Sequence, residues 1–341
     1  WQEKQDSVDA DPVGVSLGMS VLRTRERGVT AVNSQPVVAI VGPTATGKSD
    51  LALDLAESFG GPQRVEIVNA DSMQFYRGMD IGTAKLPLEH RRGFLHHQLD
   101  VLDVTEDASV AAYQEATRDI LERIAEGGKQ AIVVGGSGLY LRALLDEMQF
   151  PPTDTIVRAQ LEAELEAQGP AQLHRTLMAL DPQAAESIGS ANGRRIVRAL
   201  EVIRLTGRPY SSSLPRYTYA LPAVQIGLRA GKEFLDERIA RRAQSMFDGG
   251  LLEEVRRLEG LGLRKGKTAR RATGYAQALG VLDGVLTVDE AISATAIATR
   301  QLARRQMKWF RRDPRITWID VDRQGDVAGR AREILSSVPA A

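Results

Sequence analysis

The chain of 341 residues contains no cysteine, and no apolar run in it approaches the ~18 to 20 residues that a membrane span needs. The lack of cysteine excludes disulfides, thiolate metal sites and a cysteine nucleophile, and it fits a reducing compartment. We therefore expect a cytoplasmic protein without membrane association. An excess of charge is also lacking, because 44 Lys and Arg residues balance 44 Asp and Glu residues. A nucleic-acid surface would have to come from an uneven distribution of charge.

What the sequence does contain is typical of a globular protein, with 43% hydrophobic and 26% charged residues. The length suffices for one large domain and a smaller one. Residues 1–35 are polar and irregular, and no apolar segment of a secretory signal follows their charges. We expect these residues to form a mobile N-terminal tail.

The motif that organises the chain is Gly-Pro-Thr-Ala-Thr-Gly-Lys-Ser at residues 42–49, which matches the phosphate-loop pattern G-x-x-x-x-G-K-[ST]. A β-branched run at 37–41 precedes it, and helical spacing begins at Asp50. A glycine loop between a strand and a helix N-terminus directs backbone N–H groups at phosphate oxygens. The predicted phosphate site comprises Gly42, Pro43, Thr44, Ala45, Thr46, Gly47, Lys48 and Ser49. Lys48 would add a positive charge and the Ser49 hydroxyl would bind Mg²⁺, which an ordinary glycine-rich turn would not need.

Further segments with strand character predict an α/β fold. They are apolar, β-branched runs at 64–69, 129–134, 224–228 and 316–320. Helical segments between them, such as 109–126 and 232–258, indicate a mostly parallel sheet flanked by helices. Residues 155–204 have helical spacing and no strand pattern, and prolines bound this segment on both sides. We therefore expect a phosphate-loop core at 36–150 and 216–341, with an all-helical domain inserted at 151–215.

Asp71 follows the predicted strand at 64–69. In an open α/β sheet the ligand crevice lies at the carboxyl ends of the strands, so Asp71 is expected beside the phosphate loop. Its alternative role is that of a helix N-cap or loop-capping carboxylate. The strand at 129–134, by contrast, ends in Gly135 and Gly136 rather than in an acidic residue. The second carboxylate that many nucleotide hydrolases use for Mg²⁺ is thus missing there, which argues against hydrolase or kinase activity.

Positive charge is concentrated in the C-terminal third of the chain. Between Arg238 and Arg315, Lys and Arg clearly outnumber Asp and Glu, although the whole chain is neutral. Clusters of this kind bind the phosphate backbone of nucleic acids without reading the base sequence. For each arginine taken alone, a solvated surface position is about as good an interpretation.

Five motifs occur together in the order that one enzyme family shows. Besides residues 42–49 they are Asp71–Gln74, Gly78–Lys85, Gly135–Tyr140 and Thr299–Gln306. From about Pro36 to the C-terminus, the chain closely resembles bacterial tRNA dimethylallyltransferases. The resemblance implies a monomeric enzyme with a phosphate-loop core and an inserted helical domain. It also implies transfer of a dimethylallyl group from dimethylallyl diphosphate to N6 of the adenosine 3′-adjacent to the anticodon (position 37) of tRNA, with release of diphosphate and with Mg²⁺ as cofactor.

The resemblance also assigns roles to individual residues. It implies that Asp71 accepts the proton from N6, while Thr44 and Arg242 join the phosphate loop in holding the leaving diphosphate. The residues expected to contact the anticodon stem-loop of tRNA are Asp71, Ser72, Met73, Gln74, Ser137, Arg158, Arg194, Arg195, Arg198, Arg271, Gly274 and Tyr275.

Other functions remain open on the sequence alone. A prenyltransferase for free adenine nucleotides would share the phosphate loop, but the basic C-terminal third and the helical insertion favour a macromolecular acceptor. A small-molecule kinase should show an arginine-rich lid and a carboxylate placed for phosphoryl transfer. A non-catalytic tRNA-binding protein would not need Asp71 and Arg242. The histidines His96, His97 and His174 lack the spacing of metal ligands, so we expect packing or loop roles for them.

Overall fold

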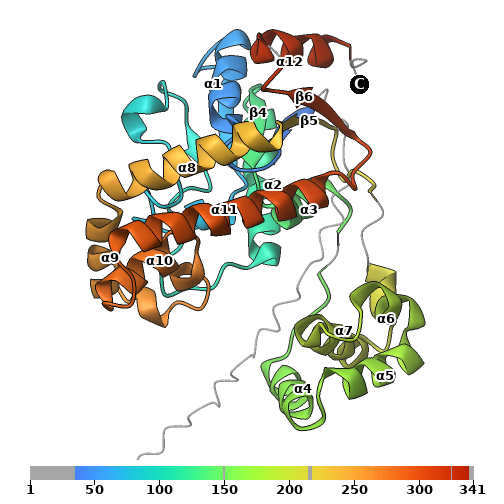
Figure 1. The fold of residues 1–341 in the computed structure, drawn as a ribbon. Helices are drawn as coiled ribbons and strands as arrows, with labels where there is room; N and C mark the ends of the chain where they lie inside the picture. Colours follow the sequence, from blue (N-terminus) through green and yellow to red (C-terminus); the bar gives the residue numbers. More distant parts are fainter. Residues whose placement is uncertain (1–34, 149, 214–216, 324, 338–341) are drawn as a thin grey trace, which may run out of the picture. The chain divides into compact units, whose positions relative to one another are not determined.

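The computed structural model describes residues 35–148, 150–213, 217–323 and 325–337. The tail predicted for residues 1–35 lies outside these ranges except for Gln35. A single sheet, covered by helices on both faces, organises the core (Figure 1).

All six strands of this sheet run parallel, in the order β3-β2-β4-β1-β5-β6. The strands are β1 (Val37–Val41), β2 (Val65–Asn69), β3 (His96–His97), β4 (Gln130–Gly135), β5 (Ala223–Arg229) and β6 (Ile316–Asp320). The α/β fold and the five predicted strands are confirmed, each strand to within one residue at either end. The edge strand β3 was not predicted, because two adjacent histidines carry no strand pattern.

Eight α-helices and several 3₁₀ helices surround this sheet in the described part of the core. The α-helices are α1 (Lys48–Ser58), α2 (Val110–Glu126), α3 (Gly138–Leu145), α8 (Lys232–Asp248), α9 (Leu251–Gly260), α10 (Tyr275–Leu282), α11 (Val288–Phe310) and α12 (Val327–Ser336). The short 3₁₀ helices are η1 (Ser72–Phe75), η2 (Leu88–His90), η4 (Leu263–Lys265) and η5 (Ala269–Arg271).

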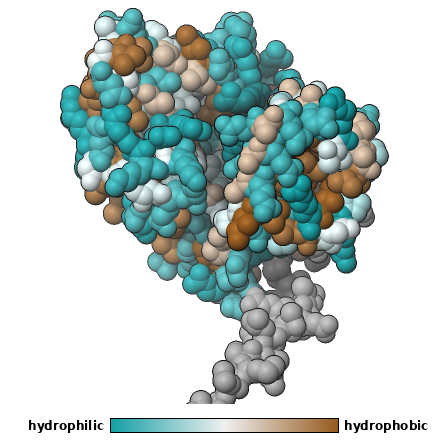
Figure 2. Space-filling model, turned by 90° about the horizontal axis from the view of Figure 1, so that it is seen from below, coloured by the Kyte–Doolittle hydropathy of each residue, from teal (hydrophilic) through white to brown (hydrophobic). Residues whose placement is uncertain are grey.

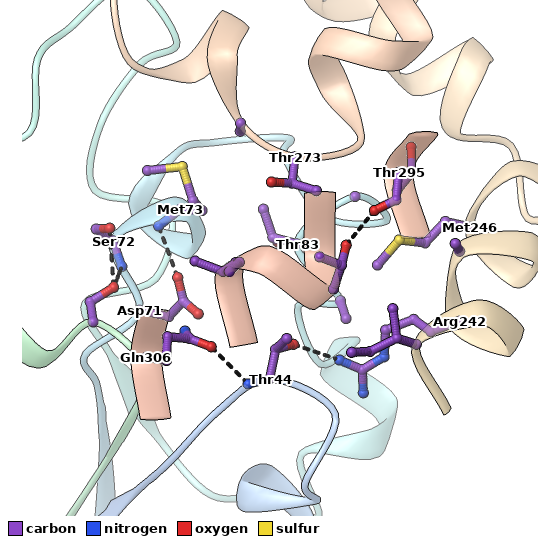
Figure 3. A pocket seen from close by; sticks show the side chains of 18 of the residues that line it. Thr44, Asp71, Ser72, Met73, Thr83, Arg242, Met246, Thr273, Thr295 and Gln306 are labelled. Atoms are coloured by element: carbon purple, nitrogen blue, oxygen red, sulfur yellow. Dashed lines mark hydrogen bonds between the residues drawn. The ribbon is translucent and has the colours of Figure 1, made fainter. Parts of the chain in front are cut away.

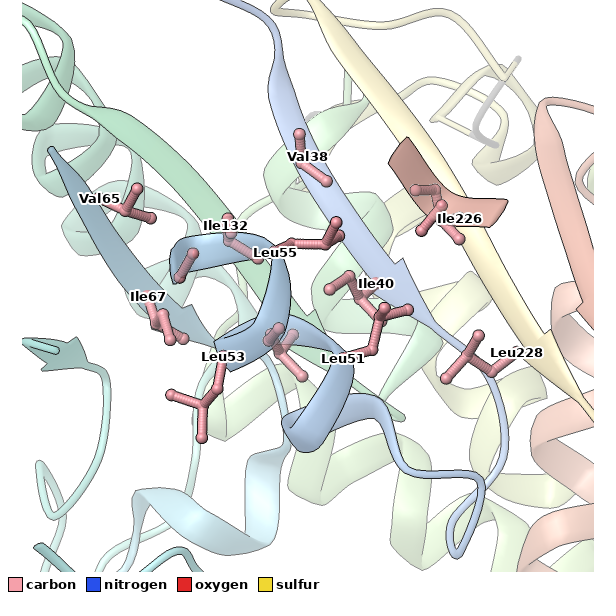
Figure 4. Packing of buried hydrophobic residues seen from close by; sticks show 14 of the residues in the cluster. Val38, Ile40, Leu51, Leu53, Leu55, Val65, Ile67, Ile132, Ile226 and Leu228 are labelled. Atoms are coloured by element: carbon pink, nitrogen blue, oxygen red, sulfur yellow. The ribbon is translucent and has the colours of Figure 1, made fainter. Parts of the chain in front are cut away.

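Both faces of the sheet are buried, as is usual for parallel sheets. Because side chains alternate along a strand, Val38 and Ile40 of β1 face α1 and α12, whereas Ala39 and Val41 face α2 and α3. Figure 4 shows the first of these two clusters, with Leu51 and other leucines of α1 packed against the strands. This packing fixes the start of α1, and therefore the phosphate loop, at the carboxyl end of β1.

The basic helices α8 and α11 lie beside each other at the carboxyl ends of the strands, the end that carries the phosphate loop. The helix predicted at 232–258 is in fact two helices, α8 and α9, because the chain turns at Gly249-Gly250, where Gly250 has a φ of 95°. Helix α11 begins at a capping box formed by Thr287 and Glu290, and it packs along α8 (Figure 1). Two long helices therefore stand side by side over the carboxyl ends of the strands.

The segment predicted to be helical at 155–204 contains α4 (Thr155–Gln168), α5 (Pro170–Leu180), α6 (Pro182–Ile188) and α7 (Gly193–Thr206), and η3 (Tyr210–Ser213) follows. These helices share a core of their own that includes Leu161, Leu177, Ile196 and Leu200. The helical prediction is confirmed, and no strand occurs in the described residues between 151 and 213. The domain boundaries themselves stay a prediction.

On the face of the molecule in Figure 2, hydrophilic side chains predominate and apolar residues occur in small groups between them. Among the described residues, no helix combines the length and apolarity that crossing a membrane would require.

Candidate active site

A cavity of about 300 Å³ opens where the loops leave the carboxyl ends of β1, β2 and β4 (Figure 3). One wall comes from α8 and another from α11, while the loop after β2 and Ser137 form the side opposite α8. Its lining comprises Thr44, Asp71, Ser72, Met73, Gly82, Thr83, Ala84, Ser137, Ile239, Arg242, Ala243, Met246, Arg271, Ala272, Thr273, Thr295, Thr299, Leu302 and Gln306. The predicted catalytic residues Thr44, Asp71 and Arg242 therefore meet in one cavity.

The phosphate loop has the predicted strand–loop–helix form. Gly42 has a φ of 132°, and a side chain there would collide with the backbone of Leu228 in β5. Gly47, in a left-handed conformation with a φ of 87°, begins α1 without a side-chain cap. The first amides of α1 are thus not occupied by a capping side chain, which is the arrangement that binds anions at helix N-termini. Lys48 and Thr46 both donate to the carbonyl of Pro43, at 2.7 and 2.8 Å.

Two cations lie beside this loop. Burial lowers the pKa of Lys48 to about 8, with the charge of Asp71 opposing the shift and that of Arg242 adding to it. The pKa of Arg242 is lowered as well, mainly by burial and then by Arg238. Arg242 Nη1 donates to Thr44 Oγ1 at 3.3 Å, which links α8 to the loop. Two desolvated positive charges so close together favour a bound anion.

Asp71 caps a short helix and also lines the cavity. Its Oδ1 accepts a hydrogen bond from the backbone N–H of Met73 at 3.0 Å, so it is the N-cap of η1. Its Oδ2 forms no hydrogen bond with the described residues, and the side chain lines the cavity (Figure 3). Burial raises the pKa of Asp71, while the Met73 N–H and the charge of Lys48 oppose this rise. A carboxylate with a raised pKa is a stronger proton acceptor.

Several residues with a predicted role in tRNA binding lie at this cavity. Ser72, Met73, Ser137 and Arg271 line it. The Ser137 hydroxyl accepts a hydrogen bond from the Ser72 N–H at 3.1 Å, which joins the loops after β2 and β4. Gln74 is not among the lining residues, because its amide turns back to the carbonyl of Thr83 at 3.1 Å.

The predicted tRNA-binding arginines of the helical segment fall into two kinds. Arg158 and Arg198 both pair with the fully buried carboxylate of Glu201, at 2.7 and 2.8 Å. Arg194 and Arg195 are exposed in the first turn of α7. The first two arginines therefore also stabilise the fold of the helical segment, whereas the latter two are available to an RNA backbone.

Gly274 and Tyr275 are both buried in this structure, and their contact with tRNA stays a prediction. The Tyr275 hydroxyl donates to Glu254 Oε1 at 2.5 Å. The same carboxylate accepts backbone N–H groups of Asp80, Ile81 and Gly82, at 3.2, 2.9 and 3.4 Å. Tyr275 and Glu254 thus hold the loop that carries Gly82 to the cavity.

Replacing Tyr275 with Phe is expected to lower the free energy of unfolding by about 1.5–3 kcal/mol, because a hydrogen bond to a buried charged group is lost. Urea denaturation measures the effect. Tyr76→Phe is the matched control. Its hydroxyl donates to the carbonyl of Glu106 at 3.3 Å and also bonds the backbone of Ala108 and the side chain of Thr268. These partners are all neutral, so removal of this hydroxyl should cost less. If both variants lose the same free energy of unfolding, the hydrogen bond to Glu254 stabilises the fold no more than a bond to a neutral group does.

Sequence reasoning missed the bridging role of Gln306. Its Oε1 accepts the backbone N–H of Thr44 at 2.9 Å, and its Nε2 donates to the carbonyl of Gly136 at 3.0 Å. Gly136 leaves the room for this contact, because a side chain there would collide with the amide. Gln306 closes the motif at 299–306, and its place in a recognised motif was the available signal.

Comparisons with known proteins agree with this arrangement. Residues 74–313 match the family described as IPP transferase. The tRNA dimethylallyltransferase of Pseudarthrobacter chlorophenolicus is 55% identical over 305 residues, which is 89% of this chain and 100% of that protein. The tRNA dimethylallyltransferase of Thermobifida fusca is 56% identical over 289 residues, which is 84% of this chain and 90% of that protein.

Solved structures give the same result. The full-length tRNA isopentenylpyrophosphate transferase of Bacillus halodurans has a TM-score of 0.63 and 37% identity, covering 89% of this chain and 97% of its own. A eukaryotic dimethylallyltransferase acting on tRNA has a TM-score of 0.76 and 28% identity, covering 88% of this chain and 78% of its own. The chain belongs to the tRNA dimethylallyltransferase family.

Proposed function

We propose that the protein transfers a dimethylallyl group from dimethylallyl diphosphate to N6 of the adenosine 3′-adjacent to the anticodon of tRNA, and that it acts as a cytoplasmic monomer. The observation that carries this proposal is the meeting of Asp71 with Thr44 and Arg242 in one cavity of about 300 Å³. Attack of N6 on the allylic carbon needs a proton acceptor for N6 and a positively charged site for the leaving diphosphate. The cavity offers both on different walls.

The diphosphate would bind at the phosphate loop. In the reaction the bond between the allylic carbon and the diphosphate oxygen breaks, and negative charge grows on the leaving group. The amides at the start of α1, together with Lys48 and Arg242, lie where they would neutralise this charge. No hydrolytic water needs to be activated, which is consistent with glycines rather than a carboxylate at the end of β4.

The adenine would enter the cavity, which Asp71 and Arg271 both line. The lone pair of N6 is delocalised into the ring, so the proton must leave N6 as its bond to the allylic carbon forms. The free oxygen of Asp71 would accept this proton. The base must leave its stack to reach the cavity, and exposed arginines such as Arg194 and Arg195 would hold the tRNA backbone.

We also propose Mg²⁺ as the cofactor. Ser49 is exposed in the first turn of α1, and among the described residues no group of three His, Cys, Asp or Glu side chains could hold a metal ion. The Ser49 hydroxyl would be the protein ligand of the ion, and diphosphate oxygens and water would supply the other ligands, as is usual for Mg²⁺. Mg²⁺ bound there would neutralise part of the diphosphate charge.

The kcat/KM for dimethylallyl diphosphate is expected to fall as the pH rises above about 8, the pKa of Lys48 in the free protein. The lysine is charged below this pH and loses its attraction for the diphosphate above it. A pH profile of kcat/KM measures this effect. Lys48→Arg should lack this alkaline decline, because a guanidinium stays charged. The same decline in both proteins would assign it to another group.

Incubation with labelled dimethylallyl diphosphate, Mg²⁺ and either unmodified tRNA or AMP tests the proposed function. Label in tRNA alone is the expected result. Label in AMP would instead indicate a nucleotide prenyltransferase. Label in neither acceptor, together with ATP turnover, would contradict both functions and favour a kinase.

A further inference from the structure

Asn69, the last residue of β2, holds Asp71 through its side-chain amide. Its Oδ1 accepts a hydrogen bond from the backbone N–H of Asp71 at 3.0 Å, and its Nδ2 donates to the backbone carbonyl of the same residue at 3.1 Å. The Nδ2 group also donates to the carbonyl of Gln98 at 2.9 Å. One amide therefore binds both backbone polar groups of Asp71 and ties them to the segment after β3.

The support behind Asn69 is rigid. The residue is 6% exposed, and its own backbone carbonyl accepts the Tyr113 hydroxyl at 3.0 Å. It lies opposite Val134 in the ladder between β2 and β4. Tyr113 in turn stacks on Phe75 of η1, with ring centroids 5.2 Å apart, and η1 is the short helix that Asp71 caps. The ladder between β2 and β4, together with the stacking of the Tyr113 ring on Phe75, thus fixes the amide from behind.

We propose that Asn69 is a positioning residue that directs the free carboxylate oxygen of Asp71 into the cavity. The inference rests on the proposed function, in which this oxygen accepts the proton of N6. With Oδ1 bound to the Met73 N–H and the backbone bound to Asn69, the Asp71 carboxylate has little freedom to turn. A misplacement of ~1 Å can cost ~10²-fold in rate, so the amide should affect the chemical step more than substrate binding.

Replacing Asn69 with Ala is expected to lower kcat by roughly 10- to 100-fold and to leave the KM values of both substrates within about twofold. Asn69→Ser should recover part of the lost rate, because its hydroxyl can still accept the Asp71 N–H, as in other short polar turns. Single-turnover kinetics with tRNA and dimethylallyl diphosphate measure the chemical step separately from product release.

Tyr113→Phe is the matched control. It removes the hydrogen bond to the backbone carbonyl of Asn69 and leaves every contact of the side-chain amide in place. Urea denaturation of all variants gives their stabilities. We expect Tyr113→Phe to lose stability while keeping a kcat near that of the unchanged protein, so that stability and rate are separated.

Asp71→Ala, measured in parallel, separates this inference from the proposed function. Full activity of Asp71→Ala would remove the proton acceptor from the mechanism and the inference with it. A strong loss in Asp71→Ala, but a kcat in Asn69→Ala and Asn69→Ser no lower than in Tyr113→Phe, would overturn the role of Asn69 alone. If Asn69→Ala does not fold, the kcat of Asn69→Ser decides in the same way.

Discussion

Replacing Asp71 with Ala should lower kcat for prenyl transfer by about 10²- to 10⁴-fold, the usual contribution of a positioned general base. The affinity for tRNA should change much less, because within the described part of the chain the carboxylate accepts one hydrogen bond, from the Met73 N–H, and its other oxygen faces the cavity. Filter binding of tRNA and single-turnover transfer of label measure the two quantities separately.

Asp71→Asn is the control that keeps the N-cap. An asparagine can accept the Met73 N–H as Asp71 does, but it cannot accept a proton from N6. The two variants should therefore lose similar amounts of activity, although Asp71→Asn should be the more stable protein. Equal losses of catalysis and tRNA binding would count against the base role and favour a structural one.

Replacing Lys48 with Ala should lower kcat/KM for dimethylallyl diphosphate by about 10²- to 10³-fold, comparable to the removal of one donor from a preorganised anion site. Lys48 lies beside Arg242 and Asp71 and is only partly exposed, so its charge on the diphosphate is screened less than that of a surface lysine. Steady-state kinetics at neutral pH and a fixed salt concentration measure this loss.

Arg241→Ala is the control for the loss of a positive charge. Arg241 lies next to Arg242 on α8, but its side chain is 68% exposed and pairs with Glu237 at 3.4 Å. Its removal should change kcat/KM for the donor less than threefold, since exposed ion pairs contribute little. A similar loss in both variants would mean that the general field of the basic helices, rather than the phosphate loop, attracts the donor.

The sequence was sufficient for the parts of the fold that local patterns determine. The strand at 37–41 is a β-branched run buried along its whole length, and the phosphate loop needs its glycines at fixed positions. The position of Asp71 beside this loop also followed from the sequence, because parallel strands bring their carboxyl ends to one edge.

Contacts between distant segments could not be predicted. Thr44 meets Arg242 across 198 residues of chain and Gln306 across 262 residues, and only the packing of α8 and α11 brings them together. Tyr275 follows a basic loop in the sequence, which suggests a surface position, but it is buried and its hydroxyl donates to Glu254. The amide of Asn69 gave no signal, since a polar residue at the end of a strand has many possible partners.

Identification of the modified nucleoside tests the central claim most directly. A tRNA with adenosine 3′-adjacent to the anticodon, and the same tRNA with guanosine there, are incubated with labelled dimethylallyl diphosphate and Mg²⁺, digested to nucleosides and analysed by mass spectrometry. We predict N6-dimethylallyladenosine from the first tRNA and no labelled nucleoside from the second. Equal labelling of both tRNAs, or label on a nucleoside elsewhere in the molecule, would contradict the proposed function.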